Sequence, residues 1–387
     1  MSTLAVLWGR FGPYHLARLR GLAEVAGTRG FSVLGVEVAQ LDHYRWNPVQ
    51  SENGVARETL FPGRAYDSLR PGEIRRKVFA ALDRIQPMVV AVNGWAMPEA
   101  RAALAWVRRT PNARAVIMSE TKVDEAPRVF WKEWVKRGIV SGAQAGLVGG
   151  QRQLEYLAQL GVPRERIRLG YNAVDNAHFE QGSAHARIHA RELRQNLHLP
   201  ERYFFACTRF LPRKNLDGLL RAYARYRNEV GASERWQLVI SGSGECEADL
   251  HGQVRVLGLA GEVHFVGFRQ YEELPAFYGL ASAFVHPALS EPWGLVVNEA
   301  AASALPLLVS RTVGSAYELV EHGVNGYTFE PGDVDAMTRV LVDITRLPEE
   351  ARSAMGNAAR ERVAEFGPER FGQGLCEAMD AARGVRR

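Results

Sequence analysis

Short apolar runs alternate with amphipathic segments along most of the chain. Short β-rich runs such as 31–38 and 113–119 predict buried strands, and segments with apolar residues at helical spacing predict the helices between them. In the first half we expect strands at 4–9, 31–38, 88–94, 113–119 and 145–149, and helices at 14–25, 72–85, 98–109 and 127–140. Such alternation, with strands that are apolar throughout, is typical of a parallel sheet covered by helices on both faces.

The same alternation returns in the second half of the chain. We expect strands at 203–210, 236–244, 262–268, 283–287, 306–310 and 326–329, and helices at 216–228, 247–257, 271–280, 295–303 and 333–345. A polar stretch with three histidines, His178, His185 and His189, interrupts the pattern and is interpreted as a linker.

The predicted fold class is therefore α/β, with two doubly wound Rossmann-like domains that face each other across a cleft. The expected boundaries are an N-terminal domain at 1–175, a linker at 176–195, a C-terminal domain at 196–365, and a final helix at 366–387 that packs back on the N-terminal domain. In doubly wound sheets, ligands bind beyond the carboxyl ends of the strands, so we expect the site there.

Length and composition fit a soluble protein of two domains. The chain has 387 residues, too many for one ordinary core, and 47% of them are hydrophobic against 24% charged. No apolar run approaches the roughly 20 residues that span a bilayer, and the N-terminus lacks the pattern of a secretory signal. The three cysteines, Cys207, Cys246 and Cys376, have no metal-like spacing and are predicted to be reduced thiols of a cytoplasmic protein.

Positive charge is concentrated in the first half. Residues 1–175 hold 25 Lys and Arg against 16 Asp and Glu, a net charge of +9, whereas the remaining residues hold 23 against 27, a net charge of −4. This asymmetry indicates either an anionic partner of the first domain or simply an Arg-rich composition. Within it, the predicted helix around 128–138 carries Phe130, Trp131 and Trp134 among basic residues; it either lies on anionic lipid or packs into its own domain.

Two carboxylates flank a Pro-Trp-Gly turn in the segment "HPALSEPWGLVVNEAAASALPLLVS". A predicted strand ends before the turn and a helix follows Gly294, so the free N–H groups of that helix make an anion site at the sheet edge. Glu291 precedes the helix and Glu299 lies more than one turn inside it; they can reach two ends of one extended ligand. They do not suit a glycosidase pair, whose carboxylates flank a single bond. The apolar setting of Glu299 predicts a buried carboxylate with a partner.

A basic cluster follows the predicted strand at 203–210. Arg209, Arg213 and Lys214 combine planar guanidinium groups with a point charge, which suits a diphosphate; the alternative is a basic loop exposed to water. Gly242 and Gly244 form a tight turn near a ligand, but a dinucleotide fingerprint requires a third glycine where this chain has Glu247.

Other predicted strand ends carry weaker candidates, each of which is also compatible with an ordinary turn or surface residue. They are Gly9, Gly12 and His15 after the first strand, Ser119 and Glu120 after the strand at 113–119, and Phe268 and Arg269 after the strand at 262–268. Asp333 and Asp335 are a weak candidate for metal binding.

Together, "RFLPRKN", "GSG", "VGF", the segment 286–310 and "GSAYELVEHGVNGYTFEPGD" resemble the retaining glycosyltransferases of GT-B architecture, family 4 (glycosyl transferases group 1). The resemblance is specific from Tyr203 to Asp333 and loose before it. It implies transfer of a sugar, with retention, from a UDP- or GDP-sugar to a hydroxyl acceptor in surface polysaccharide or glycoconjugate synthesis. The N-terminal domain would bind the acceptor and the C-terminal domain the donor.

The resemblance also implies roles for individual residues. Glu291 would contact the transferred sugar, Glu299 the ribose, and Arg209 and Lys214 the diphosphate, so Arg209, Lys214 and Glu291 are the predicted catalytic group. The predicted donor-binding residues are Gly9, Gly12, Gly242, Gly244, Phe268, Arg269, Pro292, Trp293, Gly294, Leu295, Val296 and Glu299. The acceptor-side candidates are His15, Ser119 and Glu120. No metal and no cofactor is expected.

Two departures from the family leave the donor and its sugar contacts open. Many members have a histidine where this chain has Ser119 and Glu120, and Gly-x-Gly-Pro where it has Gly244 followed by Glu245. The expected partners are the nucleotide sugar, a sugar or lipid-linked acceptor and, as an alternative, an anionic membrane surface at the inner face, but no nucleic acid. The rival functions are a nucleotide-sugar epimerase of the same fold and a non-catalytic basic protein that binds membranes or anions. An NAD dehydrogenase is disfavoured by the missing third glycine.

Overall fold

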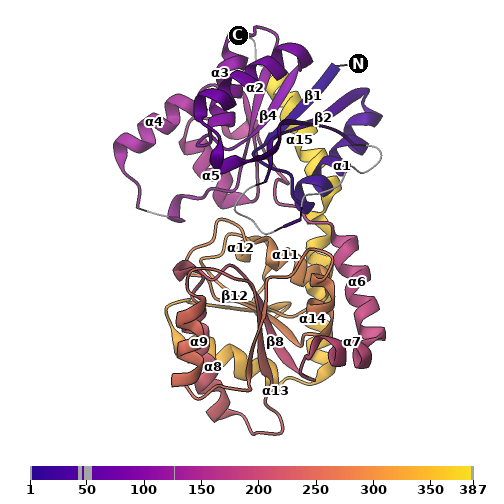
Figure 1. The fold of residues 1–387 in the computed structure, drawn as a ribbon, viewed down its shortest axis with the longest axis vertical. Helices are drawn as coiled ribbons and strands as arrows, with labels where there is room; N and C mark the ends of the chain where they lie inside the picture. The colour runs from indigo at the N-terminus through magenta and orange to yellow at the C-terminus, as the bar shows by residue number, and fades with distance from the viewer. Residues whose placement is uncertain (1, 42–45, 48–54, 126, 385–387) are drawn as a thin grey trace. The chain divides into compact units, whose positions relative to one another are not determined.

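A computed structural model describes residues 2–41, 46–47, 55–125 and 127–384. The chain forms two compact units, residues 1–175 with 366–387, and residues 176–365 (Figure 1). No helix of the residues described is both long and apolar enough to cross a membrane.

The first unit is built on a seven-stranded parallel sheet with strand order β3-β2-β1-β4-β5-β6-β7. Its strands are β1 (Ser2–Trp8), β2 (Phe31–Leu41), β3 (Ala56–Ala65), β4 (Val89–Asn93), β5 (Arg114–Ser119), β6 (Ala145–Val148) and β7 (Ile167–Leu169). Its helices are α1 (Pro13–Thr28), α2 (Pro71–Ile85), α3 (Pro98–Arg109), α4 (Phe130–Val140), α5 (Gln151–Gln159) and α15 (Pro368–Arg383).

Alternation along β1 shows how helices cover both faces of this sheet. Leu4, Val6 and Trp8 pack in a core with residues of α1 and α15, whereas Ala5 and Leu7 pack with residues of α2 and α3. Successive side chains of a strand point to opposite faces, so a strand that is apolar throughout must be buried on both. The sequence rhythm predicted this covered parallel sheet, and the structure confirms it.

The second unit is built on a six-stranded parallel sheet with strand order β10-β9-β8-β11-β12-β13. Its strands are β8 (Tyr203–Cys207), β9 (Gln237–Ser241), β10 (Val263–Gly267), β11 (Ala283–His286), β12 (Leu307–Ser310) and β13 (Gly326–Phe329). Its helices are α6 (Asn176–Ile188), α7 (Ala190–Leu197), α8 (Leu216–Glu229), α9 (Glu247–Val256), α10 (Leu274–Leu280), α11 (Leu295–Ala302), α12 (Ala316–Leu319), α13 (Val334–Arg346) and α14 (Glu349–Val363). Short 3₁₀ helices of the chain are η1 (Tyr66–Ser68), η2 (Val123–Glu125), η3 (Arg164–Arg166), η4 (Pro212–Lys214) and η5 (Ala364–Phe366).

The order of the second sheet reverses between β8 and β11. The chain proceeds outward from β8 through β9 to β10, and then returns to place β11 on the other side of β8, where Phe284 pairs with Phe205. Loops that leave two such neighbouring strands diverge and open a crevice at the carboxyl edge of the sheet. The basic cluster follows β8 and the Pro-Trp-Gly turn follows β11, so the fold brings these two sequence motifs to one place.

The stretch 176–195, predicted as a linker, is instead a packed part of the second unit. It forms α6 and most of α7, and α6 lies against α10, where Ser183 Oγ donates a hydrogen bond to the Pro275 carbonyl at 3.1 Å. Phe179, Ser183 and Ala186 are the buried residues of α6. Their spacing places them on one face, and this narrow stripe was concealed by the polar composition around it.

Candidate active site

Hydrogen bonds tie the loop after β8 to the loop after β11. The Leu289 N–H donates to the Arg213 carbonyl at 2.8 Å. The side-chain amide of Asn215 donates from Nδ2 to the Pro287 carbonyl at 3.1 Å and to the Pro331 carbonyl at 2.8 Å. Asn215 has a left-handed backbone (φ 56°), which ends η4 and lets α8 begin at Leu216. These bonds fix the end of η4, and hence Lys214, beside the β11 loop.

Lys214 and Glu291 form an ion pair at this edge. Lys214 Nζ contacts Glu291 Oε2, and the two side chains are only 9% and 12% exposed. The pair thus joins the basic cluster to the Pro-Trp-Gly turn, two motifs that are 77 residues apart in the sequence. In such a buried pair, each charge compensates the burial cost of the other.

Further basic groups surround the Glu291 carboxylate. Arg213 approaches Oε1 at 3.8 Å and also donates to the Ser290 carbonyl at 3.3 Å. His286, the last residue of β11, places Nε2 3.5 Å from Oε2. The Gly314 N–H binds the Glu291 carbonyl at 3.1 Å and holds the turn against the loop after β12.

His286 is a site residue that the sequence reasoning did not single out. Its side chain is buried, and neither ring nitrogen has a hydrogen-bond partner among the residues described. Burial, with the nearby charges of Lys214 and Arg213, lowers the pKa of His286 well below its ordinary 6.5, so the imidazole is neutral at pH 7. Its place at the end of β11, directly before the turn, is the signal that could have identified it.

The turn after Glu291 has the geometry expected for an anion site. Gly294 has φ 91°, and a Cβ there would lie 3.2 Å from both Glu291 Cγ and Val313 Cγ1, so a side chain would disturb the turn. α11 starts at Leu295, so its first N–H groups lack intrahelical acceptors and carry the positive end of the helix dipole. Leu295 and Val296, predicted to bind the donor, supply two of these groups.

Trp293, predicted to bind the donor, turns its side chain into the unit. The indole is fully buried, and its Nε1 donates to Asn298 Oδ1 at 2.8 Å. Its ring therefore anchors the turn to α11. Pro292 beside it is partly exposed.

Glu299 is buried and partnered, as its apolar sequence setting predicted. Its side chain is 0% exposed, and the Tyr278 hydroxyl donates to Oε2 at 2.7 Å. It lies close enough to Cys207 to raise the pKa of that thiol, which burial chiefly raises to about 12, so Cys207 stays protonated. Any ligand that contacts Glu299 must displace atoms that now cover it.

Gly242 and Gly244 are required by the packing of neighbouring loops. A Cβ on Gly242, which has φ 143°, would lie 1.8 Å from the Thr208 carbonyl oxygen, and a Cβ on Gly244 would lie 2.4 Å from the Phe210 carbonyl oxygen. The Phe210 N–H binds the Ser243 carbonyl at 2.9 Å, which joins the loops after β8 and β9. Both glycines are thus explained by backbone contact, with or without a ligand.

The remaining candidates of the second unit lie at the same edge. Arg209 is exposed in the loop directly after β8, and Phe268 is partly buried after β10. Arg269 pairs with Glu273 at 3.2 Å, and its guanidinium lies 4.9 Å from the centroid of the Phe277 ring. Arg269 therefore has a structural role of its own.

In the first unit, the predicted acceptor-side residues and the predicted donor-binding residues Gly9 and Gly12 lie at the carboxyl edge of the first sheet. Gly9 and Gly12 follow β1, and Ser119 is the last residue of β5 with Glu120 after it. Ser119 Oγ accepts from the Thr121 N–H at 3.2 Å. His15 Nδ1 accepts from the Gly12 N–H at 3.0 Å. Burial, together with the charges of Arg18 and Arg10, lowers the pKa of His15 to about 3, so this imidazole is also neutral.

The sequence reasoning missed a buried carboxyl beside this loop. Glu99 lies in the first turn of α3, is 2% exposed, and accepts from the Tyr66 hydroxyl at 2.6 Å. Its Oε1 lies 3.3 Å from the position of a Cβ on Gly9. Burial raises the pKa of Glu99. Its place soon after β4, at the same sheet edge, could have pointed to it.

The weak metal candidate has structural partners. Asp333 caps α13 by accepting from the Ala336 N–H at 2.8 Å, and Asp335 pairs with Arg225. Within the described part of the chain, no cluster of three or more His, Cys, Asp or Glu side chains could hold a metal ion.

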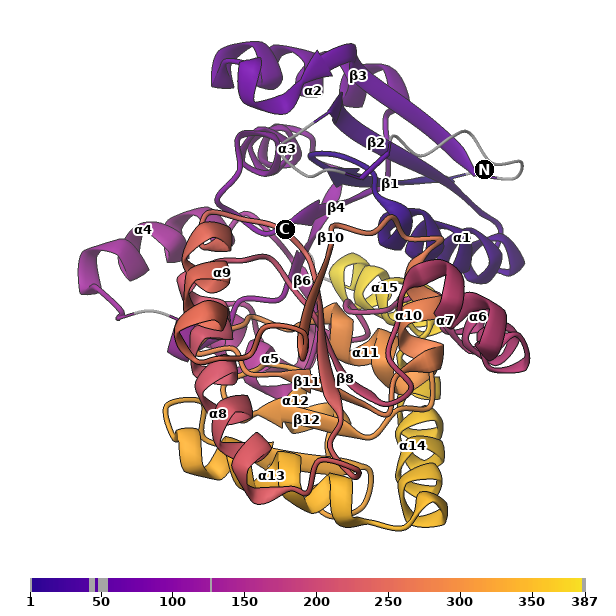
Figure 2. The same cartoon turned by 60° about the horizontal axis from the view of Figure 1, so that its bottom comes forward.

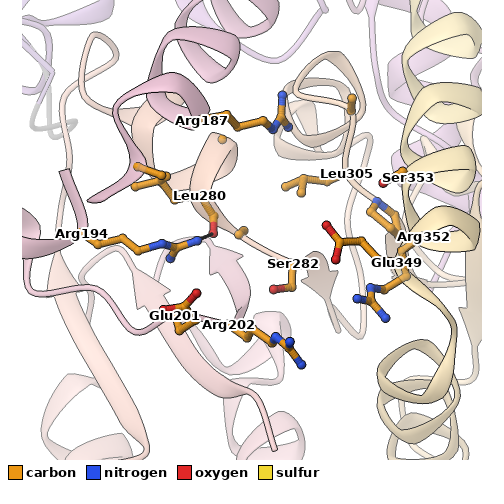
Figure 3. Close-up of a pocket in the computed structure, with 15 residues that line it drawn as sticks. Arg187, Arg194, Glu201, Arg202, Leu280, Ser282, Leu305, Glu349, Arg352 and Ser353 are labelled. Carbon is orange, nitrogen blue, oxygen red and sulfur yellow. Dashed lines mark hydrogen bonds between the residues drawn. The ribbon is translucent and has the colours of Figure 1, made fainter. Parts of the chain in front are cut away.

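A cavity of about 420 Å³ lies in the second unit, near the amino ends of its strands (Figure 3). Arg187, Arg194, Arg202 and Arg352 line it. Arg194 donates to the Leu280 carbonyl at 2.9 Å and Arg187 to the Ser303 carbonyl, while Arg352 lies 5.1 Å from the centroid of the Trp236 ring. Three of these guanidinium groups therefore bind the surrounding chain, and the cavity lies at the sheet edge opposite to Lys214 and Glu291.

Part of the chain is similar in sequence to known proteins. Residues 190–362 match the model of the family "Glycosyl transferases group 1". A relative from Mycobacterium tuberculosis, "GDP-mannose-dependent alpha-(1-6)-phosphatidylinositol monomannoside mannosyltransferase", is 32% identical over 180 residues, 44% of this chain and 46% of the relative. The chain thus spans about half the length of the curated relatives it matches.

Solved structures match nearly the whole chain. The sucrose-phosphate synthase of Thermosynechococcus elongatus has a TM-score of 0.74 at 20% identity and covers 97% of this chain and 98% of its own. HepE of Anabaena, solved with UDP and glucose, has a TM-score of 0.73 at 18% identity, with 98% and 100% covered. The fold is the GT-B fold, and residues 190–362 match the group 1 glycosyltransferase model, in agreement with the resemblance that the sequence motifs indicated.

Proposed function

We propose that the chain is a retaining glycosyltransferase. It moves a sugar from a nucleoside-diphosphate sugar to a hydroxyl acceptor. The observation that carries the proposal is the buried ion pair of Lys214 and Glu291 beside the N-terminus of α11, where the order of the second sheet reverses. A cation, a carboxylate and a helix N-terminus at one crevice suit a ligand with a diphosphate and a sugar.

Cleavage of the bond between sugar and diphosphate develops negative charge on phosphate oxygens. Lys214, Arg209 and the first N–H groups of α11 are the groups that would stabilise this charge. Their loops are held by hydrogen bonds before a ligand enters, so little reorganisation is needed during the reaction. Electrostatic stabilisation of this kind needs neither a nucleophilic side chain nor a metal.

Glu291 would bind hydroxyls of the transferred sugar. It already pairs with Lys214, so an entering diphosphate would share that ammonium, and the carboxylate would gain hydroxyl donors in exchange. Glu299 would bind the ribose from inside α11. Retention follows from the resemblance to family 4, and either a UDP- or a GDP-sugar remains the proposed donor.

The acceptor would be bound by the first unit, where Ser119, Glu120 and His15 lie at the sheet edge. A sugar or lipid-linked acceptor of surface polysaccharide or glycoconjugate synthesis is proposed. The mannosyltransferase name of one relative, and the complex of HepE with UDP and glucose, support a sugar-transfer role in general.

Thermal unfolding with a ligand panel tests this proposal. UDP, GDP, ADP, dTDP and NAD are each added to the purified chain with and without Mg²⁺. A ligand at about 100 times its Kd stabilises the native state by about 2.7 kcal/mol. One nucleoside diphosphate should therefore raise Tm measurably, and its identity shows which base the donor carries. If no diphosphate raises Tm, the donor site is rejected in favour of a non-catalytic protein.

The matching nucleotide sugars then separate transfer from epimerisation. A transferase releases the nucleoside diphosphate only when a suitable acceptor or water takes the sugar. An epimerase of the same fold would give an epimeric sugar with no acceptor present, and this product in a sugar analysis would contradict the proposal.

A further inference from the structure

Helix α4 presents its apolar side chains to solvent. Phe130 is 85% exposed, Trp131 62%, Trp134 71% and Val135 44%. At 3.6 residues per turn these four side chains fall on one side of the helix, here called the aromatic face. Both views show α4 standing at the outer margin of its unit (Figures 1 and 2).

The opposite side of α4 is polar and faces the unit. Lys136 Nζ donates to Glu133 Oε1 at 2.7 Å and to the Tyr156 hydroxyl at 2.9 Å. That hydroxyl donates to Glu133 Oε2 at 2.8 Å. The usual amphipathic arrangement is therefore reversed, because the ionic residues attach α4 to α5 while the aromatic residues point away.

This reversal decides between the two interpretations that the sequence left open for the segment. A helix that packs an aromatic face into its own domain would bury Phe130 and both tryptophans, and α4 buries only Val140. Large apolar side chains gathered on one exposed surface mark a surface that binds something else. Trp and Phe are the side chains that favour the boundary between lipid headgroups and acyl chains.

The charges around the aromatic face indicate what it binds. Lys132 precedes Val135 by three residues and Arg137 follows Trp134 by three, so two exposed cations border the face on its two edges. The first unit as a whole holds 29 Lys and Arg against 19 Asp and Glu. An anionic surface complements this excess of positive charge.

A second copy of the chain is a poorer occupant. In a two-fold contact the same face meets itself, so the bordering cations would approach cations of the other copy. A bilayer with anionic headgroups instead accepts the aromatic side chains and neutralises Lys132 and Arg137 at the same time.

We propose that α4 docks this protein on the surface of an anionic phospholipid bilayer. The helix lies in the plane of the membrane, with Phe130, Trp131 and Trp134 in the headgroup boundary and Lys132 and Arg137 on lipid phosphates. With 11 residues α4 is too short to span the bilayer, so the contact is peripheral. This inference does not rest on the proposed transferase activity.

Co-sedimentation of the full chain with lipid vesicles tests the proposal. The vesicles are phosphatidylcholine alone or a mixture rich in phosphatidylglycerol, at low and high salt. We expect binding to the anionic vesicles that weakens with salt. The triple variant Phe130→Ser, Trp131→Ser and Trp134→Ser should lower the partition coefficient by about tenfold or more. Lys132→Glu should lower it roughly tenfold, because it reverses one charge at the surface.

The matched control replaces exposed apolar residues elsewhere. Ile188 and Val256 are 79% and 86% exposed on the second unit, and Ile188→Ser with Val256→Ser should leave vesicle binding unchanged. The triple variant should keep the wild-type circular dichroism and any Tm shift given by a nucleoside diphosphate, which shows that it is folded.

Three results would overturn the proposal. The wild type could remain in the supernatant with anionic vesicles, or the triple variant could bind as well as the wild type. Alternatively, sedimentation equilibrium could show a dimer that the triple variant converts to a monomer, which would assign the aromatic face to self-association.

Discussion

At the scale of single residues, Lys214 combines a structural and a proposed catalytic role. Lys214→Ala should lower the transfer rate by about 10²–10³, because one donor to the leaving diphosphate is lost. It should also destabilise the second unit by up to about 3 kcal/mol, since the mostly buried Glu291 carboxylate loses its nearest cation and keeps only Arg213, 3.8 Å away. Steady-state kinetics and urea denaturation measure the two effects separately.

A second substitution separates these two roles of Lys214. The double variant Lys214→Ala with Glu291→Gln removes the poorly compensated carboxylate charge and should recover part of the lost stability without recovering activity. Arg311→Ala is the control, since Arg311 forms an exposed ion pair with Glu330 in the same unit and should affect neither quantity. Wild-type kinetics for Lys214→Ala would contradict the proposed role.

Glu299 offers a prediction about the ribose. Glu299→Gln keeps the shape of the side chain but removes the charge that would accept hydroxyl hydrogen bonds. It should weaken binding of the ribonucleoside diphosphate roughly tenfold or more, and should weaken the 2′-deoxy analogue less. Calorimetric titration of both nucleotides measures this difference, and equal losses for the two would argue against ribose contact.

Tyr278→Phe is the companion variant for Glu299. It removes the 2.7 Å hydrogen bond to Oε2 and leaves a buried carboxylate with fewer donors. It should therefore lower the free energy of unfolding by about 1–3 kcal/mol. Tyr278→Phe could lower the stability without causing the ribose-specific loss of affinity. That result would show that Tyr278 supports the fold, whereas contact with the ribose is a separate role of Glu299.

At the scale of elements, the close approach of the β8 and β9 loops makes a prediction about glycine. Gly242→Ala places a Cβ 1.8 Å from the Thr208 carbonyl at a strained φ, so it should destabilise the second unit by about 2 kcal/mol or more. Gly231→Ala is the matched control, because a Cβ there meets no atom within 4 Å and its φ is not positive. Thermal unfolding compares them, and similar Tm values would contradict the packing argument.

The sequence predicted best the strands and helices in which the pattern of apolar residues is strong. Buried parallel strands such as β5 contain a continuous apolar run, here residues 115–118, so their positions follow from composition alone. β3 was missed because it is an edge strand with four of its ten residues exposed and a proline within it. α6 was missed because only three of its residues are buried.

The same contrast holds for the candidate site. Glu291 and Lys214 were identifiable because strand ends of one parallel sheet share an edge, and topology brings them together. His286 and Glu99 could have been suspected from their places near strand ends. Their burial and the inward ring of Trp293 depend on packing, which no local pattern encodes.

At the scale of the whole molecule, two buried neutral histidines predict how stability responds to acid. The pKa of His15 is lowered to about 3 and that of His286 well below 6.5, whereas both titrate near 6.5 in the unfolded chain. Below pH 6.5 the unfolded state therefore binds more protons than the native state. The stability due to each neutral histidine is complete above pH 6.5 and is lost as the pH falls toward the native pKa.

The two histidines lie in different units, so their effects can be assigned separately. Urea unfolding at pH 7.5, 6.5, 5.5 and 4.5 should show the free energy of unfolding falling by up to about 1.4 kcal/mol per pH unit for each histidine. His15→Asn should reduce this slope only in the transition of residues 1–175 with 366–387, and His286→Asn only in that of residues 176–365. An unchanged slope in either variant would mean that the native imidazole is protonated or exposed. A change in both transitions would mean that the two units unfold as one cooperative body.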